Sequence, residues 1–287
     1  MSISKLKLHD IQEFGIAPAK AGDIRVDRLE QRLKPRVPFP HKHNFFHFLC
    51  LRKARGSHEI DFQRFSAASN QVFFVKPGEV HAWDFSPSTR GFVIEFSRES
   101  LRGDFWTKQG GLSQLDSLPS VFSFTQEEGF LALCELMLVE VETQGAGGAL
   151  CLENLVSVFL LKAMRQTKTE SPKSKGARND LVARFSALVE EEFYREHSPE
   201  FYADCLGVTA KALTMRCRRV LGKPAGIVIR DRILLEAKRL LSYGDSAIAE
   251  IGYKLGFEDP NYFARFFRTQ SGISPGRFRN LAKRTLI

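Results

Sequence analysis

The chain has 287 residues, of which 43% are hydrophobic, and its formal net charge is +9. This length and composition are typical of a globular protein with two domains. Five cysteines, an odd number without CxxC spacing, argue for a reducing compartment and against a disulfide framework. The sequence has no signal-peptide pattern and no uninterrupted apolar run long enough to span a bilayer, so we expect a cytoplasmic protein without a membrane partner.

Residues 24–100 show the pattern of short strands separated by turns. Stretches such as "FFHFLCLR" and "RGFVIEFS" are rich in aromatic and β-branched residues. Turns between these strands are indicated by Gly56, Pro77, Gly78 and Pro87. Several short strands at this spacing predict an antiparallel β-barrel or sandwich, and we assign residues 1–125 to this domain.

Histidines gather within the predicted strands. In "PHKHNFFHF", His41 and His43 are two residues apart and share a face of a strand, and His47 falls on that face by parity. In "PGEVHAW", His81 follows a Pro-Gly turn, with Trp83 close behind. These five side chains are candidates for contact with a small organic effector. We expect Phe46, Phe48 and Phe74 to line the same pocket, and His58 to face solvent.

Two other interpretations of the histidines stay open. In the first interpretation, the histidines are ordinary core residues. In the second, a metal ion is held by His41, His43, His47 and His81, because neutral imidazoles suit zinc, iron, nickel or copper. Residues 35–98 resemble the cupin barrel, whose first motif has His-x-His followed by Glu and whose second has a Pro/Gly turn before His. His47 stands where that family has the Glu. We expect no resident cofactor.

Residues 126–166 are predicted to form two helices, at about 126–143 and 148–166. The first carries an apolar stripe of Phe130, Leu133, Met137 and Val141; the second carries Leu152, Leu155, Phe159 and Leu160. The stripes indicate a helical hairpin packed on the barrel. The same apolar faces also suit a homodimer interface, and the two roles can coexist.

A polar, basic linker is predicted at residues 167–179, where Pro172 and Gly176 interrupt any apolar periodicity. Beyond it the charge changes. From Lys173 to the end, 21 Lys and Arg residues stand against 13 Asp and Glu residues, which gives +8 of the total +9. This asymmetry favours a polyanion-binding C-terminal half, residues 180–287, although a solvated basic surface would have the same composition.

The C-terminal half contains an internal repeat of helix, turn and helix, at residues 199–226 and 246–276. In both copies the first helix ends at Leu-Gly. The second helix begins after a capping residue, Thr209 or Asp259, and stops at Gly222 or Gly272. Between the copies, residues 225–244 predict one long connecting helix. This is the pattern of a tandem helix-turn-helix.

The second helix of each repeat has the composition of a DNA recognition helix. Asn261, Arg265 and Arg268 share one face, opposite the phenylalanines. Asn pairs with adenine and Arg with guanine in the major groove, so Asn261 and Arg265 are expected to read bases and Arg268 to meet phosphate. Asp259 stands at the start of this helix. The corresponding candidates in the first repeat are Lys211, Thr214, Met215 and Arg218. A helical bundle with a solvated basic face is the alternative.

Residues 181–280 resemble the paired helix-turn-helix domain of the AraC/XylS transcription regulators. The resemblance rests on "RILLEAKRLL", "IAEIGYKLGFEDPNYFARFFRTQSGISPGRFR" and, more loosely, "LGVTAKALTMRCRRVLGKP". It implies a two-domain α+β protein with a cupin-like ligand-sensing domain. It also implies sequence-specific, usually dimeric, control of transcription with RNA polymerase as a partner. The first repeat departs from the family pattern at Thr214, Met215 and Arg216, where Arg216 is expected to turn toward the buried side and Met215 toward a thymine methyl.

We therefore expect a transcription activator, not an enzyme, that binds double-stranded promoter DNA under control of a small-molecule effector. One alternative is a cupin-type metal-binding enzyme or metal sensor with an attached DNA-binding domain. An enzyme would need a carboxylate beside the histidines, and Glu79 and Asp84 are the candidates. Another alternative is a nonspecific architectural DNA binder, whose affinity would depend on salt and not on sequence.

Overall fold

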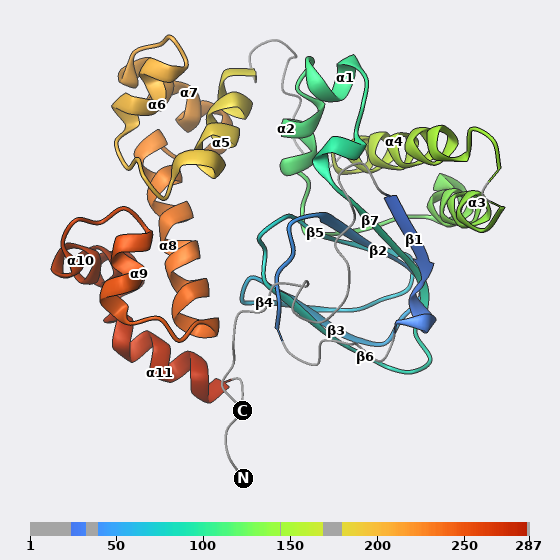
Figure 1. Ribbon diagram of the computed structural model, residues 1–287, viewed down its shortest axis with the longest axis horizontal. Coiled ribbons are helices and arrows are strands. Elements are labelled where there is room, and N and C mark those ends of the chain that lie inside the picture. Colours follow the sequence, from blue (N-terminus) through green and yellow to red (C-terminus); the bar gives the residue numbers. More distant parts are fainter. Residues whose placement is uncertain (1–23, 33–39, 144, 169–179, 286–287) are drawn as a thin grey trace. The chain divides into compact units, whose positions relative to one another are not determined.

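A computed structural model describes residues 24–32, 40–143, 145–168 and 180–285, which are drawn in colour in Figure 1. The chain divides into two compact units, with the boundary between residues 173 and 174. The first is built on β-sheets and the second is helical, which confirms the predicted α+β fold class. Most of the predicted linker, residues 169–179, lies outside the described residues, and residues 167 and 168 belong to the helix before it.

In the described part of the N-terminal unit, strands form two antiparallel sheets. The larger has the order β1–β7–β2–β5–β8, and the smaller has the order β4–β3–β6. The strands are β1 (Ile24–Arg28), β2 (Phe46–Lys53), β3 (Gly56–Ile60), β4 (Gln63–Ser66), β5 (Gln71–Val75), β6 (His81–Phe85), β7 (Arg90–Phe96) and β8 (Val121–Ser123). The sheets remain separate and do not close into the predicted barrel.

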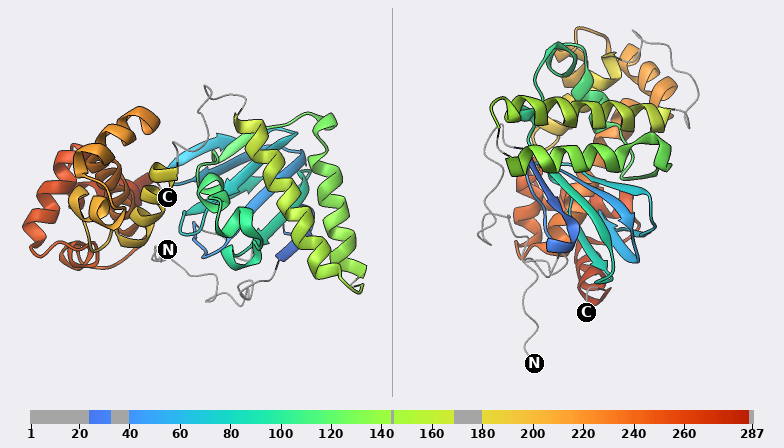
Figure 2. Two further views of the ribbon diagram at one scale, coloured as in Figure 1. Left: turned by 90° about the horizontal axis from the view of Figure 1, so that it is seen from above. Right: turned by 90° about the vertical axis from the view of Figure 1, so that its right-hand side faces the viewer.

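The alternation of side chains along β2 explains how the layers pack. Phe46, Phe48 and Cys50 point to one face of the large sheet, where they meet helices α3 (Phe130–Thr143) and α4 (Gly148–Lys168). Leu49 and Leu51 point to the other face and pack with residues of the small sheet. Figure 2 shows α3 and α4 side by side across the large sheet. The strand is therefore buried on both faces.

This layering corrects the predicted pocket lining. Phe46, Phe48 and Phe74 belong to the core beneath α3 and α4, whereas His47 lies between Phe46 and Phe48 and points to the opposite face. Phe48 and Phe74 stack on one another with ring centroids 4.2 Å apart. The three phenylalanines thus support the helical layer and do not share a face with the histidines.

The helical hairpin forms as predicted, with a later start. A 3-10 turn (η4, Gln126–Glu128) precedes α3, and Gly129 separates the two in the left-handed conformation, with φ 71°. The short helices α1 (Asp104–Thr107) and α2 (Gly111–Asp116) and the 3-10 turns η2 (Leu29–Gln31) and η3 (Arg98–Ser100) complete the unit. None of the described helices is both long and apolar enough to cross a membrane.

Seven described helices build the C-terminal unit. They are α5 (Asp180–Glu192), α6 (Pro199–Cys205), α7 (Ala210–Leu221), α8 (Ala225–Tyr243), α9 (Ile248–Lys254), α10 (Pro260–Ser271) and α11 (Pro275–Thr285). The predicted repeat is confirmed as α6–α7 and α9–α10. Both second helices end at a left-handed glycine, Gly222 with φ 71° and Gly272 with φ 80°, a conformation that glycine adopts without steric cost.

Helix α8 joins the two repeats through one buried stripe. Ile229, Ile233 and Ala237 are spaced four residues apart and are all fully buried. They belong to the same core as Leu213 of α7 and Phe263 of α10. Figure 1 shows α6 and α7 beside the start of α8, and α9 and α10 beside its later turns. One helix therefore fixes both repeats.

A second connection links the two repeats at Gly256, in the turn after α9. Its φ is 79°, and a Cβ at this position would lie 2.7 Å from the backbone oxygen of Tyr194. Next to it, His197 Nε2 donates a hydrogen bond of 2.7 Å to the backbone oxygen of Leu255. The segment that leads into the first repeat thus packs against the turn of the second.

Candidate nucleic-acid interface and histidine cluster

The start of α10 is fixed by local chemistry. The side chain of Asp259 accepts a hydrogen bond of 2.8 Å from the backbone N–H of Asn261, and Pro260 occupies the first helical turn, where its missing N–H costs nothing. Phe263 and Phe267 are fully buried against the core. These contacts fix which face of α10 turns outward.

The outward face of α10 carries the predicted residues. Asn261, Arg265 and Arg268 are all exposed. The Asn261 amide donates to Asp259 Oδ1 at 3.1 Å, and the guanidinium of Arg265 lies over the ring of Tyr262, with its Cζ 5.2 Å from the ring centroid. Tyr262, 63% exposed, was missing from the sequence prediction, although its i, i+3 spacing to Arg265 was a readable signal.

Helix α7 presents a different outward face. Thr209 caps it by accepting a hydrogen bond of 3.2 Å from the backbone N–H of Ala212. Lys211 and Arg218 are exposed, Met215 is 61% exposed, and Thr214 is partly buried. Arg216 is partly buried and stands between the exposed Met215 and the buried Cys217.

The cations of these two faces are available to an anionic partner. Lys211, Arg218, Arg265 and Arg268 form no ion pair with a carboxylate of the described residues. By contrast, Arg232 and Arg239 of α8 both pair with Glu236, at 3.1 and 2.9 Å. Side chains that the fold leaves free of carboxylates are those that phosphates and base edges can take.

The structure brings the four predicted histidines together in the N-terminal unit. Ring centroids lie 4.5 Å apart for His41 and His81, 4.9 Å for His43 and His81, and 5.4 Å for His43 and His47. Those of His47 and His81 are 5.2 Å apart, and Trp83 stacks on His47 at 5.6 Å. We call these five residues, with His58, the histidine cluster.

Strand pairing explains the convergence. His41 and His81 exchange two backbone hydrogen bonds, of 3.1 and 2.8 Å, which hold the His-x-His segment against β6. His47 on β2 stands directly opposite Glu95 on β7. The cluster therefore draws on three separate segments and could not be placed from spacing alone.

His58 contradicts the expectation that it faces solvent. It is fully buried on β3, and its Nε2 lies 3.0 Å from Nδ1 of His81. Its cross-strand partner is Trp83 of β6. Because β3 belongs to the small sheet that faces the large one, its alternate residues point inward. The alternation of side chains within "GSHEI" does not show which of the two alternate sets of residues points inward.

Glu95 was also absent from the sequence prediction. It is 2% exposed, and its Oε1 accepts hydrogen bonds from His47 Nδ1 at 3.1 Å and from Arg32 at 2.9 Å. Burial alone would raise the pKa of Glu95, but the hydrogen bond from His47 and the charges of His47 and Arg32 outweigh burial and lower its pKa to about 2. A lone carboxylate inside the apolar strand "GFVIEF" was the available signal.

The carboxylates expected near the histidines have other roles. Glu79 Oε2 accepts a hydrogen bond of 2.8 Å from the backbone N–H of Lys76 and so closes the turn before β6. Asp84 is exposed on the outer face of β6. The carboxylate that does lie beside an imidazole is Glu95, against His47.

Three rings of the cluster, those of His43, His58 and His81, are buried in a setting that favours the neutral imidazole. Burial, and then the neighbouring imidazoles, lower the pKa of His43, His58 and His81 well below the usual value of 6.5. Several buried nitrogens have no hydrogen-bond partner in the described structure: Nε2 of His43, His47 and His81, Nδ1 of His58 and Nε1 of Trp83. No group of three or more His, Cys, Asp or Glu side chains among the described residues is arranged, as it stands, to hold a metal ion.

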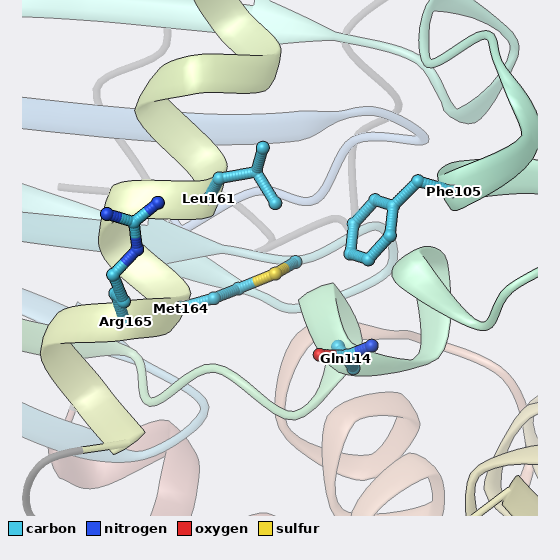
Figure 3. A pocket seen from close by; sticks show the side chains of 5 residues that line it. All are labelled: Phe105, Gln114, Leu161, Met164 and Arg165. Atoms are coloured by element: carbon cyan, nitrogen blue, oxygen red, sulfur yellow. The ribbon is translucent and has the colours of Figure 1, made fainter. Parts of the chain in front are cut away.

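A separate pocket lies on the helical side of the same unit. Figure 3 shows Phe105 and Gln114 facing Leu161, Met164 and Arg165 of α4. Its volume is about 180 Å³. Pockets for organic ligands usually measure about 300–1,000 Å³, so this one is small for an effector site.

Comparison with known proteins supports both units. A model of the AraC-like ligand binding domain matches residues 24–157, and a model of a helix-turn-helix domain matches residues 202–281. The transcriptional activator RhaS of Escherichia fergusonii is 24% identical over 285 residues, covering 95% of this chain and 96% of RhaS. The transcriptional activator RhaR of Klebsiella pneumoniae is 21% identical over 251 residues, covering 85% of this chain and 88% of RhaR.

Two solved structures are also similar to parts or most of the chain. ToxT from Vibrio cholerae, in complex with an unsaturated fatty acid, matches 89% of this chain and 94% of its own, with 11% identity and a TM-score of 0.40. The DNA-binding domain of AdpA, in complex with target DNA, matches 37% of this chain and 96% of its own, with 24% identity and a TM-score of 0.35. With a ligand-binding domain followed by paired helix-turn-helix motifs, the chain belongs to the AraC/XylS family of transcription regulators.

Proposed function

We propose that this protein is a sequence-specific transcription activator that places α7 and α10 in two successive major grooves of promoter DNA. One observation carries the proposal: both helices have capped starts, buried apolar backs and exposed polar fronts, and both are fixed to α8. Adjacent major grooves on one side of the duplex are about 34–36 Å apart. Activation is proposed because RhaS and RhaR are named as transcriptional activators.

The contacts of the two helices divide between bases and backbone. Asn261 is proposed to pair with adenine and Arg265 with guanine, as bidentate hydrogen bonding in the major groove favours. Arg268 and the first-repeat cations Lys211 and Arg218 suit phosphates. Met215 and Thr214 suit the methyl group of thymine. Asp259 acts indirectly, by holding the start of α10 and the amide of Asn261.

In the N-terminal unit we propose that the effector binds at the histidine cluster, in contact with His41, His43, His47, His81 and Trp83. The buried nitrogens without partners support this location, since an unsatisfied buried polar group costs about 1–3 kcal/mol. Residues 1–125 would sense the effector, residues 126–166 would dimerise and residues 180–287 would bind DNA. The effector changes transcription only if it binds one arrangement of these parts better than another.

The apolar stripes expected to serve also as the dimer interface are buried in the core, as Phe130, Met137 and Phe159 show, so that expectation is corrected. The dimer is proposed to form instead through the outer face of the α3–α4 hairpin. Five large apolar side chains are exposed there: Leu136, Val139, Leu150, Val158 and Leu161. A double substitution, Leu150→Glu with Val158→Glu, should turn a dimer into a monomer in sedimentation analysis. Phe62→Glu, at an apolar residue 38% exposed on the turn between β3 and β4, serves as the matched control and should leave the dimer intact.

RNA polymerase is the further partner that activation requires, and the cytoplasm is the compartment in which promoter DNA is met. We assign no catalytic role and no cofactor. The carboxylate close to the cluster, Glu95, pairs through its Oε1 with His47 and Arg32.

Selection from random duplex DNA at near-physiological salt tests the proposal. Purified full-length protein should enrich a motif with two half-elements about one helical turn apart. Binding without enrichment would mean that α7 and α10 contact only phosphates. That result would contradict the proposed sequence-specific function.

A further inference from the structure

Tyr262 of α10 lies on the outward face of its helix and takes little part in the core. Its side chain is 63% exposed, whereas Phe263 and Phe267 are fully buried and anchor the helix. Stabilisation by an apolar side chain grows with the area that it removes from water, so the ring of Tyr262 contributes little to folding. Its role has to be found among its exposed neighbours.

The neighbour in contact with Tyr262 is Arg265. The two residues are three apart and lie on adjacent turns of the helix. Arg265 Cζ lies over the Tyr262 ring, 5.2 Å from its centroid, within the distance of about 6 Å at which the face of an aromatic ring attracts a cation. Long side chains of a helix lean toward its N-terminus, so this contact holds the guanidinium over the first turns of α10. Those turns are the ones that enter the major groove in helix-turn-helix proteins.

The first repeat lacks both members of the pair. Counted from the capping residues, α7 carries Ala212 and Met215 at the two positions where α10 carries Tyr262 and Arg265. The buried positions of both helices stay apolar. The ring and the guanidinium are therefore present together in one repeat and absent together from the other, as expected for two side chains with one task.

Both proposed base-reading side chains of α10 are held by a neighbour. The Asn261 amide donates to Asp259 Oδ1 at 3.1 Å, and Arg265 lies over Tyr262. A guanidinium donates its hydrogen bonds within its own plane, so a ring over one of its faces leaves the N–H edge open to a base. A side chain that is held before binding loses less entropy when it meets its partner. Without the ring, the guanidinium is free to meet phosphates, which carry no sequence information.

We infer that Tyr262 is a positioning residue for sequence recognition, whose ring holds the Arg265 guanidinium so that Arg265 reads guanine and not the phosphate backbone. The inference rests on the proposed function, in which Arg265 meets guanine. Tyr262 acts through Arg265 and supplies its aromatic face. The ring is therefore required and the hydroxyl is not.

Two duplexes test this role with the full-length chain: the selected operator, and the same operator with one base pair exchanged. The exchanged pair is the one at which Arg265→Ala loses discrimination. Tyr262→Leu keeps apolar bulk and removes the ring. It should weaken binding to the operator roughly 2–10-fold, which corresponds to the cost of ordering one long side chain, and leave binding to the exchanged duplex unchanged.

Two further variants complete the test. Tyr262→Phe keeps the ring and should bind both duplexes as the wild type does. Tyr253→Leu is the matched control, because Tyr253 of α9 is 58% exposed and no cation of the described residues lies over its ring. Equal losses on the two duplexes in Tyr262→Leu would mean that Tyr262 contacts the DNA backbone itself. Equal losses in Tyr262→Phe and Tyr262→Leu would assign the effect to the hydroxyl. Either result would overturn the inference.

A double-mutant cycle separates positioning from an independent contact. In a chain that already carries Arg265→Ala, Tyr262→Leu should have no further effect on operator affinity, because the ring acts only through the guanidinium. If the two losses multiply, the side chains act independently and the inference is wrong.

Nuclear magnetic resonance of the free chain examines the pair without DNA. The ring current of Tyr262 should move the side-chain protons of Arg265 upfield. Tyr262→Leu should return them to the positions typical of an unstructured chain while far-UV circular dichroism stays the same. Unshifted Arg265 protons in the wild-type chain would show that the ring does not hold the guanidinium in solution, and would overturn the inference.

Failure of the inference differs from failure of the proposed function. An enriched operator with unchanged discrimination in Tyr262→Leu contradicts the inference alone. Absence of an enriched operator contradicts the proposed function, and with it the reading role of both residues, even where the resonance shift shows that the pair forms.

Discussion

The polar side chains of the histidine cluster are buried, whereas those on the outward face of α10 are exposed. In the cluster, imidazoles and one carboxylate are buried, so burial and near neighbours control their protonation. On α10, Asn261, Arg265 and Arg268 are exposed and keep their charge or amide ready for a partner. Buried polar groups respond strongly to pH and to a ligand that reaches them, while exposed ones respond to salt and to a surface that covers them. The two units should therefore fail under different conditions.

The largest expected effect is acid destabilisation of the N-terminal unit alone. His43, His58 and His81 have lowered pKa values in the folded state and the usual pKa of 6.5 when unfolded, so the unfolded chain takes up more protons as the pH falls below 6.5. From pH 7.5 to 5.5, three such histidines should remove roughly 4 kcal/mol from the free energy of unfolding. Glu95, with a pKa of about 2, stays ionised throughout this window.

Urea unfolding in the presence of a chelator checks this, because both tryptophans, Trp83 and Trp106, belong to the N-terminal unit and report on it alone. His58→Asn should remove about a third of the pH effect. A flat pH profile of tryptophan-detected stability would show that His43, His58 and His81 are not neutral when the chain is folded.

The next largest effect concerns base reading by α10. Arg265→Ala should weaken binding to the selected operator by about 1–3 kcal/mol and abolish discrimination at one base pair. Fluorescence anisotropy at fixed salt, on the operator and on a duplex with that pair exchanged, measures both quantities. Arg277→Ala, an exposed arginine of α11, is the matched control. Equal losses on the two duplexes would mean that Arg265 meets phosphate.

A smaller effect compares the caps of the two recognition helices. Thr209→Ala and Asp259→Ala should each lower the free energy of unfolding of the C-terminal unit by about 1 kcal/mol, as far-UV circular dichroism of the full chain would show. Asp259→Ala should also relax the base pair read by Asn261, because Asp259 holds that amide. If both variants alter specificity alike, the cap of α7 has a part in base reading too.

The smallest effect belongs to Arg218 of α7, which is proposed to meet phosphate. Arg218→Ala should reduce the slope of log K against log salt by about 1 and weaken all sequences to the same extent. A change in the preferred sequence would place Arg218 among the residues that read bases.

The features that the sequence could predict are those that depend on residues close to one another in the chain. The caps at Thr209 and Asp259, the closing glycines and the outward line of Asn261, Arg265 and Arg268 depend on neighbours within one or two helical turns. All of them could be predicted from local spacing. The structure confirms the caps, the glycines and the exposure of these side chains, while their contacts with DNA stay a prediction.

The N-terminal unit was harder because its site depends on which strands meet. Parity placed His41, His43 and His47 on one side, but nothing in "GSHEI" shows that β3 turns His58 toward His81. Glu95 joins His47 only through the register of β2 with β7. The same register sends Phe46 and Phe48 to the opposite layer, and two separate antiparallel sheets stand where a barrel or sandwich was predicted.

The single helix α8 has a consequence for the operator. Because its stripe of Ile229, Ile233 and Ala237 anchors both α7 and α10, the distance and angle between the recognition helices are set inside the protein. One base pair inserted between the half-elements would move one of them about 3.4 Å along the duplex and rotate it by about 34–36°. Because α8 fixes this separation, target promoters should share one spacing between the two half-elements even where their base sequences differ.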